Sequence, residues 1–113
     1  MKRFLLIAAF AVALFAPCSR ADYQPQTATE AVFYAQGVVD TNVEITPLLA
    51  IPATQRISFR AMASNNALLA ALCAIAAGEE SDPSHAAPLR IASAYFAGRA
   101  DAFLAVADLL GEP

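Results

Sequence analysis

The sequence predicts an all-α protein, a small bundle of three to five helices that follows a cleaved signal peptide. Hydrophobic residues make up 58% of the 113 residues, which excludes an intrinsically disordered chain. Alanine, the strongest helix former, occupies about a quarter of the positions. Capping and helix-ending residues separate the apolar segments. This length suits one domain, so we expect a signal peptide at 1–21 and a single helical domain at 22–113.

Residues 1–21 carry the pattern of an export signal. Two basic residues precede an unbroken apolar run at 4–16. That run is shorter than the roughly 17 to 25 residues of a membrane-spanning helix, and it fits the apolar region of a secretory signal. The small residues Ser19 and Ala21 place cleavage after Ala21. An uncleaved anchor is the alternative, and lipidation at Cys18 is a poorer one.

Cleavage would leave an acidic chain of bacterial origin in the periplasm or outside the cell. Four arginines and no lysine remain against ten acids, a net charge of −6. The lack of a basic patch disfavours nucleic acid as a partner and, for the same reason, an anionic membrane surface. We expect no stable membrane insertion after cleavage. Cys73 is the only remaining cysteine, so it is either buried or paired between two chains.

The first helix is expected from about Ala28 to Asp40. Thr27 and Glu30 have the spacing of a capping box, in which a hydroxyl and a carboxylate satisfy free amides at the helix start. The polar residues that follow Asp40 are expected to end the helix.

Residues 43–60 allow two interpretations. The alternation of apolar and polar residues favours a short β or irregular segment, and Pro47 and Pro52 exclude one continuous helix. The favoured alternative is a helix from Thr54 to Ala63, because its residues are good helix formers.

Two further helices complete the expected bundle. The segment 64–66 has the composition of a cap and turn. The helix at 67–77 is apolar on all sides, so we expect it to be the central, buried helix, ended by Gly78. A charged loop at 79–85 then leads to a last helix at about 88–110.

The last helix has one apolar and one polar side. Arg90, Asp101 and Asp108 fall on one stripe, which is expected to face solvent. Arg99 lies instead on the apolar side. A charge there must be paired, reach water or contact a partner. The predicted ionic partner is Asp40, while Arg56, Arg60 and Arg90 are expected to point to water.

A heptapeptide pattern, Y-x-x-G-x-x-D, occurs twice, at 34–40 and at 95–101. A glycine inside a helix costs about 0.5–1 kcal/mol relative to alanine, and close approach of another backbone is the usual compensation. We therefore expect the first and last helices to pack near the two glycines; chance recurrence in an alanine-rich chain is the alternative. The candidate helix-packing or partner-binding residues are Tyr34, Gly37, Asp40, Tyr95, Gly98, Arg99 and Asp101.

The residues needed for catalysis are sparse. His85 is the only histidine, and its neighbours Asp82 and Ser84 are adjacent in sequence without the geometry of a triad. No cluster with metal-ligand spacing and no phosphate-binding glycine-rich loop is recognised. We expect no enzyme activity, no metal site and no cofactor.

The segment 94–102 resembles the G-Y-x-x-G-x-x-D-A signature of small helical periplasmic immunity proteins, and the copy at 34–40 resembles it also. The resemblance implies a small helical bundle, often a homodimer, that neutralises an effector of type VI secretion. The expected function is therefore binding to another protein, with an immunity or inhibitor role as its sharpest form. The alternative is a structural or chaperone-like envelope protein without a dedicated effector; a small exported enzyme is the least supported class.

Overall fold

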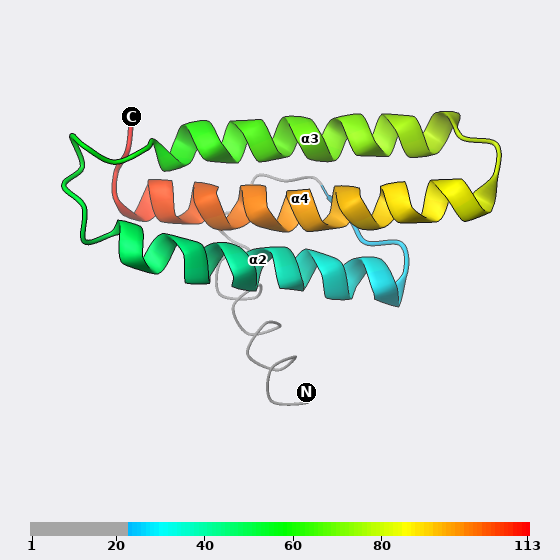
Figure 1. Ribbon diagram of the computed structural model, residues 1–113, viewed down its shortest axis with the longest axis horizontal. Helices are drawn as coiled ribbons and strands as arrows, with labels where there is room; N and C mark the ends of the chain where they lie inside the picture. Colours follow the sequence, from blue (N-terminus) through cyan, green and yellow to red (C-terminus); the bar gives the residue numbers. More distant parts are fainter. Residues whose placement is uncertain (1–22) are drawn as a thin grey trace.

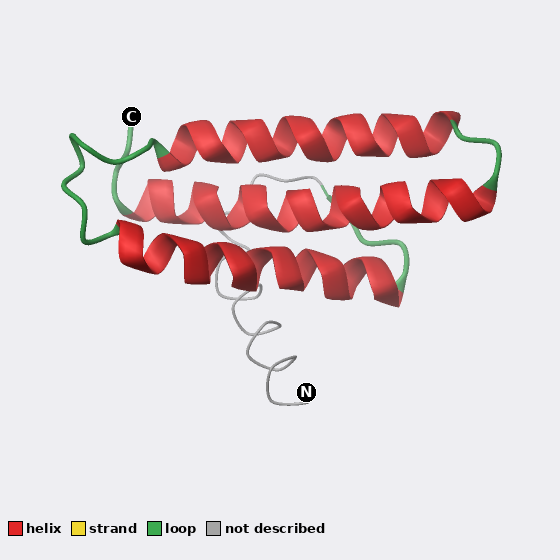
Figure 2. Cartoon of the chain, in the orientation of Figure 1, coloured by secondary structure: helices red, strands yellow, loops and turns green. Residues whose placement is uncertain are grey.

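A computed structural model describes residues 23–113, which form three helices: α2 (Ala28–Leu48), α3 (Phe59–Glu79) and α4 (Pro83–Leu109) (Figure 1). The part of the chain from 23 onward contains no strand (Figure 2). The all-α class is thus confirmed. The predicted signal peptide lies outside the described residues.

The helix in the middle of the fold is α4 (Figure 1). α2 runs parallel to it on one side and α3 antiparallel on the other, and within residues 23–113 the two outer helices make no close contact with each other. The prediction that 67–77 is the central helix is therefore wrong. α4 takes this place because small side chains let two neighbours approach it closely. Its buried alanines and glycine are Ala86, Ala94, Ala97, Gly98, Ala100, Ala102, Ala105 and Ala107.

α2 begins where the capping box predicts. The Glu30 amide donates to the Thr27 hydroxyl at 3.1 Å, and this hydroxyl donates to the Glu30 carboxylate at 3.0 Å. The predicted end at Asp40 is wrong, since α2 continues to Leu48. Thr41 and Ile45, 0% and 2% exposed, extend the buried side of the helix. Pro47 lies in the last turn of α2, so the backbone donor that it removes is lost near the end of the helix.

The stretch 43–60 contains no strand and no helix capped by Thr54. Residues 49–58 form an irregular connection, and Ser58 caps α3 by accepting from the Ala61 amide at 3.1 Å. The helix starts here because Phe59, 0% exposed, stacks on Phe103 of α4 with ring centroids 6.2 Å apart.

The predicted turn at 64–66 lies inside α3. Asn66 is buried, and its side-chain amide donates to the Met62 carbonyl at 2.8 Å. An asparagine tends to leave a helix because it competes for backbone hydrogen bonds. Here the side chain bonds to a carbonyl of its own helix, so the helix continues and the predicted turn is absent.

The chain end supplies a second cap to α3. The Glu112 carboxylate accepts from the Phe59 amide at 3.1 Å, from the Arg60 amide at 3.0 Å and from the Ser58 hydroxyl at 3.0 Å. Burial raises the pKa of Glu112, but these hydrogen bonds and the charge of Arg56 outweigh it, so the pKa lies below its ordinary value. The first turn of α3 has no acidic residue of its own, and Glu112 takes that role.

Glu112→Gln is expected to lower the free energy of unfolding by about 1 kcal/mol at pH 7, as loss of a helix cap does. Because the pKa of Glu112 is depressed in the fold, its contribution is present above the unfolded value near 4.3 and is lost as the pH falls through the folded value. Urea unfolding of parent and variant at pH 7 and pH 3 measures the difference. An equal gap at both pH values would contradict the cap.

Candidate functional site

The two copies of the Y-x-x-G-x-x-D pattern meet where α2 packs against α4. A Cβ added at Gly37 would collide with the Tyr95 carbonyl oxygen and lie 3.1 Å from the Arg99 amide nitrogen. A Cβ at Gly98 would collide with the Tyr34 carbonyl oxygen. The two helix backbones therefore touch at both glycines, which is the arrangement that the repeated pattern indicates.

The tyrosines and aspartates of the two copies are cross-paired. The Tyr34 hydroxyl donates to the Asp101 carboxylate, and the Tyr95 hydroxyl donates to Asp40 Oδ2 at 2.8 Å. Burial, followed by the hydrogen bond to Asp40, raises the pKa of Tyr95. Because α2 and α4 are parallel, these reciprocal bonds relate the two helices by an approximate two-fold axis that runs in the helix direction.

Two residues of the predicted solvent stripe on α4 are engaged in contacts. Asp101 is only 5% exposed, and Asp108 forms an ion pair with Arg60 at 2.7 Å. The predictions that Asp101 faces solvent and that Arg60 points to water are thus wrong. Both predictions fail because α4 packs against a helix on each of two sides, so little of its surface is exposed to water.

Arg99 joins all three helices. From α4 its guanidinium donates to Glu44 of α2 at 2.9 Å and to Asn66 of α3 at 3.2 Å, and it lies 5.5 Å from the centre of the Phe103 ring. The predicted pairing with Asp40 is wrong.

Asp40 is engaged elsewhere. In addition to the Tyr95 hydroxyl, it accepts from the Gln36 side-chain amide at 2.6 Å. Arg99 instead reaches one turn further along α2, to Glu44, and its second contact, to Asn66, links the two outer helices. The helical pattern predicts the place of Arg99 on the apolar side of α4, but no spacing in the sequence indicates Glu44 and Asn66 as its partners.

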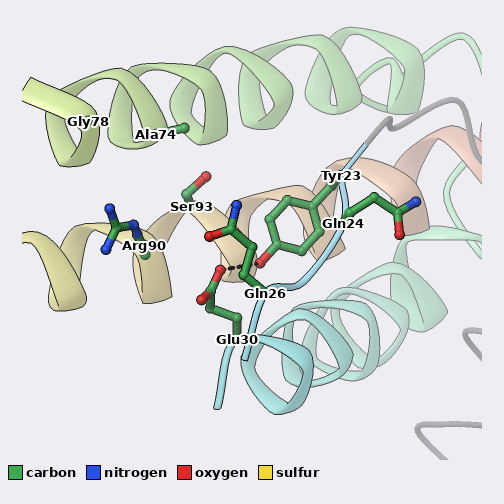
Figure 3. A pocket seen from close by; sticks show the side chains of 8 residues that line it. All are labelled: Tyr23, Gln24, Gln26, Glu30, Ala74, Gly78, Arg90 and Ser93. Atoms are coloured by element: carbon green, nitrogen blue, oxygen red, sulfur yellow. Dashed lines mark hydrogen bonds between the residues drawn. The ribbon is translucent and has the colours of Figure 1, made fainter. Parts of the chain in front are cut away.

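A hollow of about 470 Å³ opens where the segment before α2 crosses α4 (Figure 3). The Tyr23 hydroxyl donates to Glu30 at 3.4 Å, and burial together with this carboxylate raises the pKa of Tyr23 to about 12. The Ser93 hydroxyl donates to the Ala70 carbonyl at 2.8 Å, so it is committed to the backbone. The full lining is Tyr23, Gln24, Gln26, Glu30, Ala74, Gly78, Arg90 and Ser93.

This arrangement can bind polar groups, because Arg90 and two glutamines offer donors at the rim. The Ser93 hydroxyl in its lining donates to a backbone carbonyl, whereas the Tyr23 hydroxyl donates to the Glu30 carboxylate. His85 lies in the first turn of α4, with its side chain 70% exposed and 3.6 Å from Asp82. Among residues 23–113 no group of three His, Cys, Asp or Glu side chains could hold a metal ion.

The outward side of α3 is a second candidate site, and the sequence analysis missed it. Leu68, Leu69, Leu72 and Ile75 are 60%, 42%, 53% and 58% exposed. By length and composition α3 could cross a membrane, although no membrane is present and 22% of its most apolar part is buried in the fold. The available signal was the spacing of its large residues, which all lie on one side while the alanines that face α4 lie on the other.

No family model, no curated protein and no solved structure matches this chain. Its function is therefore inferred from the geometry of the described residues.

Proposed function

We propose that this chain is an exported, acidic helical protein that acts by binding another protein and carries out no chemistry of its own. The observation that carries the proposal is the outward side of α3, where Leu68, Leu72 and Ile75 are each more than half exposed. Soluble proteins rarely leave large side chains clustered in this way unless a partner covers them.

A protein partner suits this surface better than a lipid bilayer. The inner side of α3 is already occupied by polar contacts to α4, through Asn66 and through the Ala70 carbonyl. If α3 crossed a bilayer with its packing intact, α4 would carry Arg99 and Asp101 into the lipid, where charged side chains are costly. Lying on an anionic membrane is opposed by the net charge of −6 expected for residues 22–113.

An immunity or inhibitor role is the specific form of the proposal, and it rests on the resemblance of the 34–40 and 95–101 segments to periplasmic immunity proteins. A structural or chaperone-like envelope protein is the second candidate, favoured by the broad apolar side of α3. The two differ in stoichiometry. An immunity protein binds one effector in a saturable complex, whereas a chaperone-like protein covers many unfolded clients.

The test is binding to the product of the neighbouring gene, since immunity genes stand beside effector genes. Titration calorimetry with the parent chain is expected to give a saturable complex, and Leu72→Glu is expected to weaken it at least 100-fold by placing a charge in the covered surface. Val43→Glu is the matched control, because Val43 is 69% exposed on α2, away from this surface. Equal binding by all three chains would overturn the proposal.

A further inference from the structure

We propose that the hollow beside Tyr23, together with a groove that adjoins it between α3 and α4, binds a single-chain zwitterionic lipid. The head group occupies the hollow (Figure 3), and the alkyl chain lies along the groove. The exposed leucines of α3 lie outside this lining, so the site is separate from the proposed protein-binding surface and the inference does not depend on it.

The groove exists because small side chains face each other where α3 packs against α4. It has a volume of about 280 Å³ and shares Tyr23, Ala74 and Ser93 with the hollow, so the two cavities adjoin. A smaller cavity of about 180 Å³ shares two alanines with the groove and extends it to Ala63 and Leu104. The remaining lining of the groove consists of Ala67, Ala70, Ala71, Ala97 and Ala100.

This lining suits an alkyl chain better than a peptide. Alanine methyl groups offer no hydrogen bond, and the Ser93 hydroxyl is already committed to the Ala70 carbonyl at 2.8 Å. A peptide would therefore leave backbone amides without partners on the side that faces the groove, which is costly. Along α3 the cavities extend from Gly78 to Ala63, about 22 Å at the helical rise per residue. That length accommodates a long unbranched chain.

The hollow offers one charge of each sign to a ligand. Glu30 is 6% exposed, and its carboxylate accepts from the Tyr23 and Thr27 hydroxyls, both of which are neutral donors. Arg90 is exposed at the rim. Within residues 23–113 neither Glu30 nor Arg90 forms an ion pair. Because a buried charge is stabilised by an opposite one, an ammonium group suits Glu30, and a phosphate suits Arg90.

A zwitterionic head group fits this pair better than a head group of one charge. An anionic head would meet the Glu30 carboxylate and a cationic head would meet Arg90, so each would add a repulsion. Gln24 and Gln26 offer amide donors and acceptors to ester and hydroxyl groups. These features together match a lysophosphatidylethanolamine, which carries an ammonium, a phosphate and one hydrocarbon chain.

Titration calorimetry of the exported chain with myristoyl lysophosphatidylethanolamine, kept below its critical micelle concentration, tests the inference. One molecule is expected to bind per chain. Arg90→Ala and Glu30→Gln are each expected to weaken binding at least tenfold, since each removes a charged partner of the head group. Both variants should keep the fold, because Arg90 is exposed and glutamine also serves in a capping box. A parent chain that binds no lipid overturns the inference.

A second pair of variants tests the groove. Ala74 is exposed where the hollow meets the groove, so Ala74→Phe should block the chain and weaken binding at least tenfold. Ala61→Phe is the matched control, because Ala61 is exposed on α3 and lies outside the groove. Circular dichroism checks that both variants are folded. If Leu72→Glu abolishes lipid binding while Ala74→Phe does not, the lipid lies on the outward side of α3 and the inference is overturned.

Two further ligands test the assignment of the head group and the chain. Myristoyl lysophosphatidylglycerol lacks the ammonium, so the parent should bind it at least tenfold more weakly, and Glu30→Gln should remove this difference. Equal binding of both lipids by the parent would overturn the role of Glu30. Glycerophosphoethanolamine lacks the chain and is expected to bind far more weakly than the lipid. If it binds as tightly, the groove contributes nothing and the inference fails.

Discussion

Replacement of either Gly37 or Gly98 by alanine is expected to destabilise the fold by about 3 kcal/mol, because overpacking of a tight contact typically costs 1–3 kcal/mol and sometimes more. The added methyl group meets a backbone carbonyl oxygen of the facing helix at both positions. A backbone atom cannot turn aside as a flexible side chain can, so the two helices must separate. For a domain of this size the melting temperature should fall by more than about 10 °C.

Gly78→Ala is the matched control, since nothing lies within 4 Å of a Cβ at Gly78. Alanine is the better helix former there, so this variant should gain about 0.5–1 kcal/mol. Glycine-to-alanine substitution is thus expected to lower the free energy of unfolding where α2 crosses α4 and to raise it at Gly78, outside the crossing. Thermal melting followed by circular dichroism measures all three variants. A loss at Gly78, or a gain at Gly37 or Gly98, would show that the close contact between α2 and α4 is wrong.

Arg99→Ala is expected to cost about 2–3 kcal/mol. It leaves the buried Asn66 oxygen without this donor, and an unsatisfied buried polar group costs about 1–3 kcal/mol. Packing of the side chain against the Phe103 ring is lost as well. The Glu44 side chain is 42% exposed and recovers solvation, so the full penalty of breaking a buried ion pair does not apply.

Arg90→Ala provides the comparison, because Arg90 is exposed at the rim of the hollow beside Tyr23. A surface change of this kind should stay within about 0.5 kcal/mol. Chemical unfolding of both variants tests the difference. Arg99→Lys should recover only part of the loss, since a lysine lacks the fork that reaches two acceptors. If Arg99→Ala unfolds like Arg90→Ala, the link between the three helices contributes nothing to stability.

The sequence was informative where a local rule acts alone. The capping box at Thr27 and Glu30 depends on neighbouring residues only, and it marks the true start of α2. The repeated glycines carry a cost that close packing offsets, and this cost predicts the close contact of α2 and α4 at Gly37 and Gly98.

The predictions failed where distant parts of the chain decide the outcome. The polar residues after Asp40 end a helix in isolation, yet Thr41 and Ile45 are buried against the rest of the fold, which carries α2 onward. Glu112 caps a helix more than fifty positions earlier in the chain, and no spacing rule reaches that far.

The order of the helices was misjudged for a different reason. We expected the most apolar helix to be central, but large apolar residues such as Leu68 and Leu72 hold neighbours apart and remain outside. The helix that accepts two neighbours is α4, whose buried residues are mostly alanine and glycine. In this fold the central helix is therefore the one with small buried side chains, and not the most hydrophobic one.

The central position of α4 also determines when this protein can fold. α2 and α3 are made first, yet within the described residues neither finds its packing surface on the other. A chain that ends before residue 83 therefore has two helices and no core, and isolated helices of this length are marginal in water. Stable packing of α2 and α3 therefore requires α4, the helix on which both of them assemble.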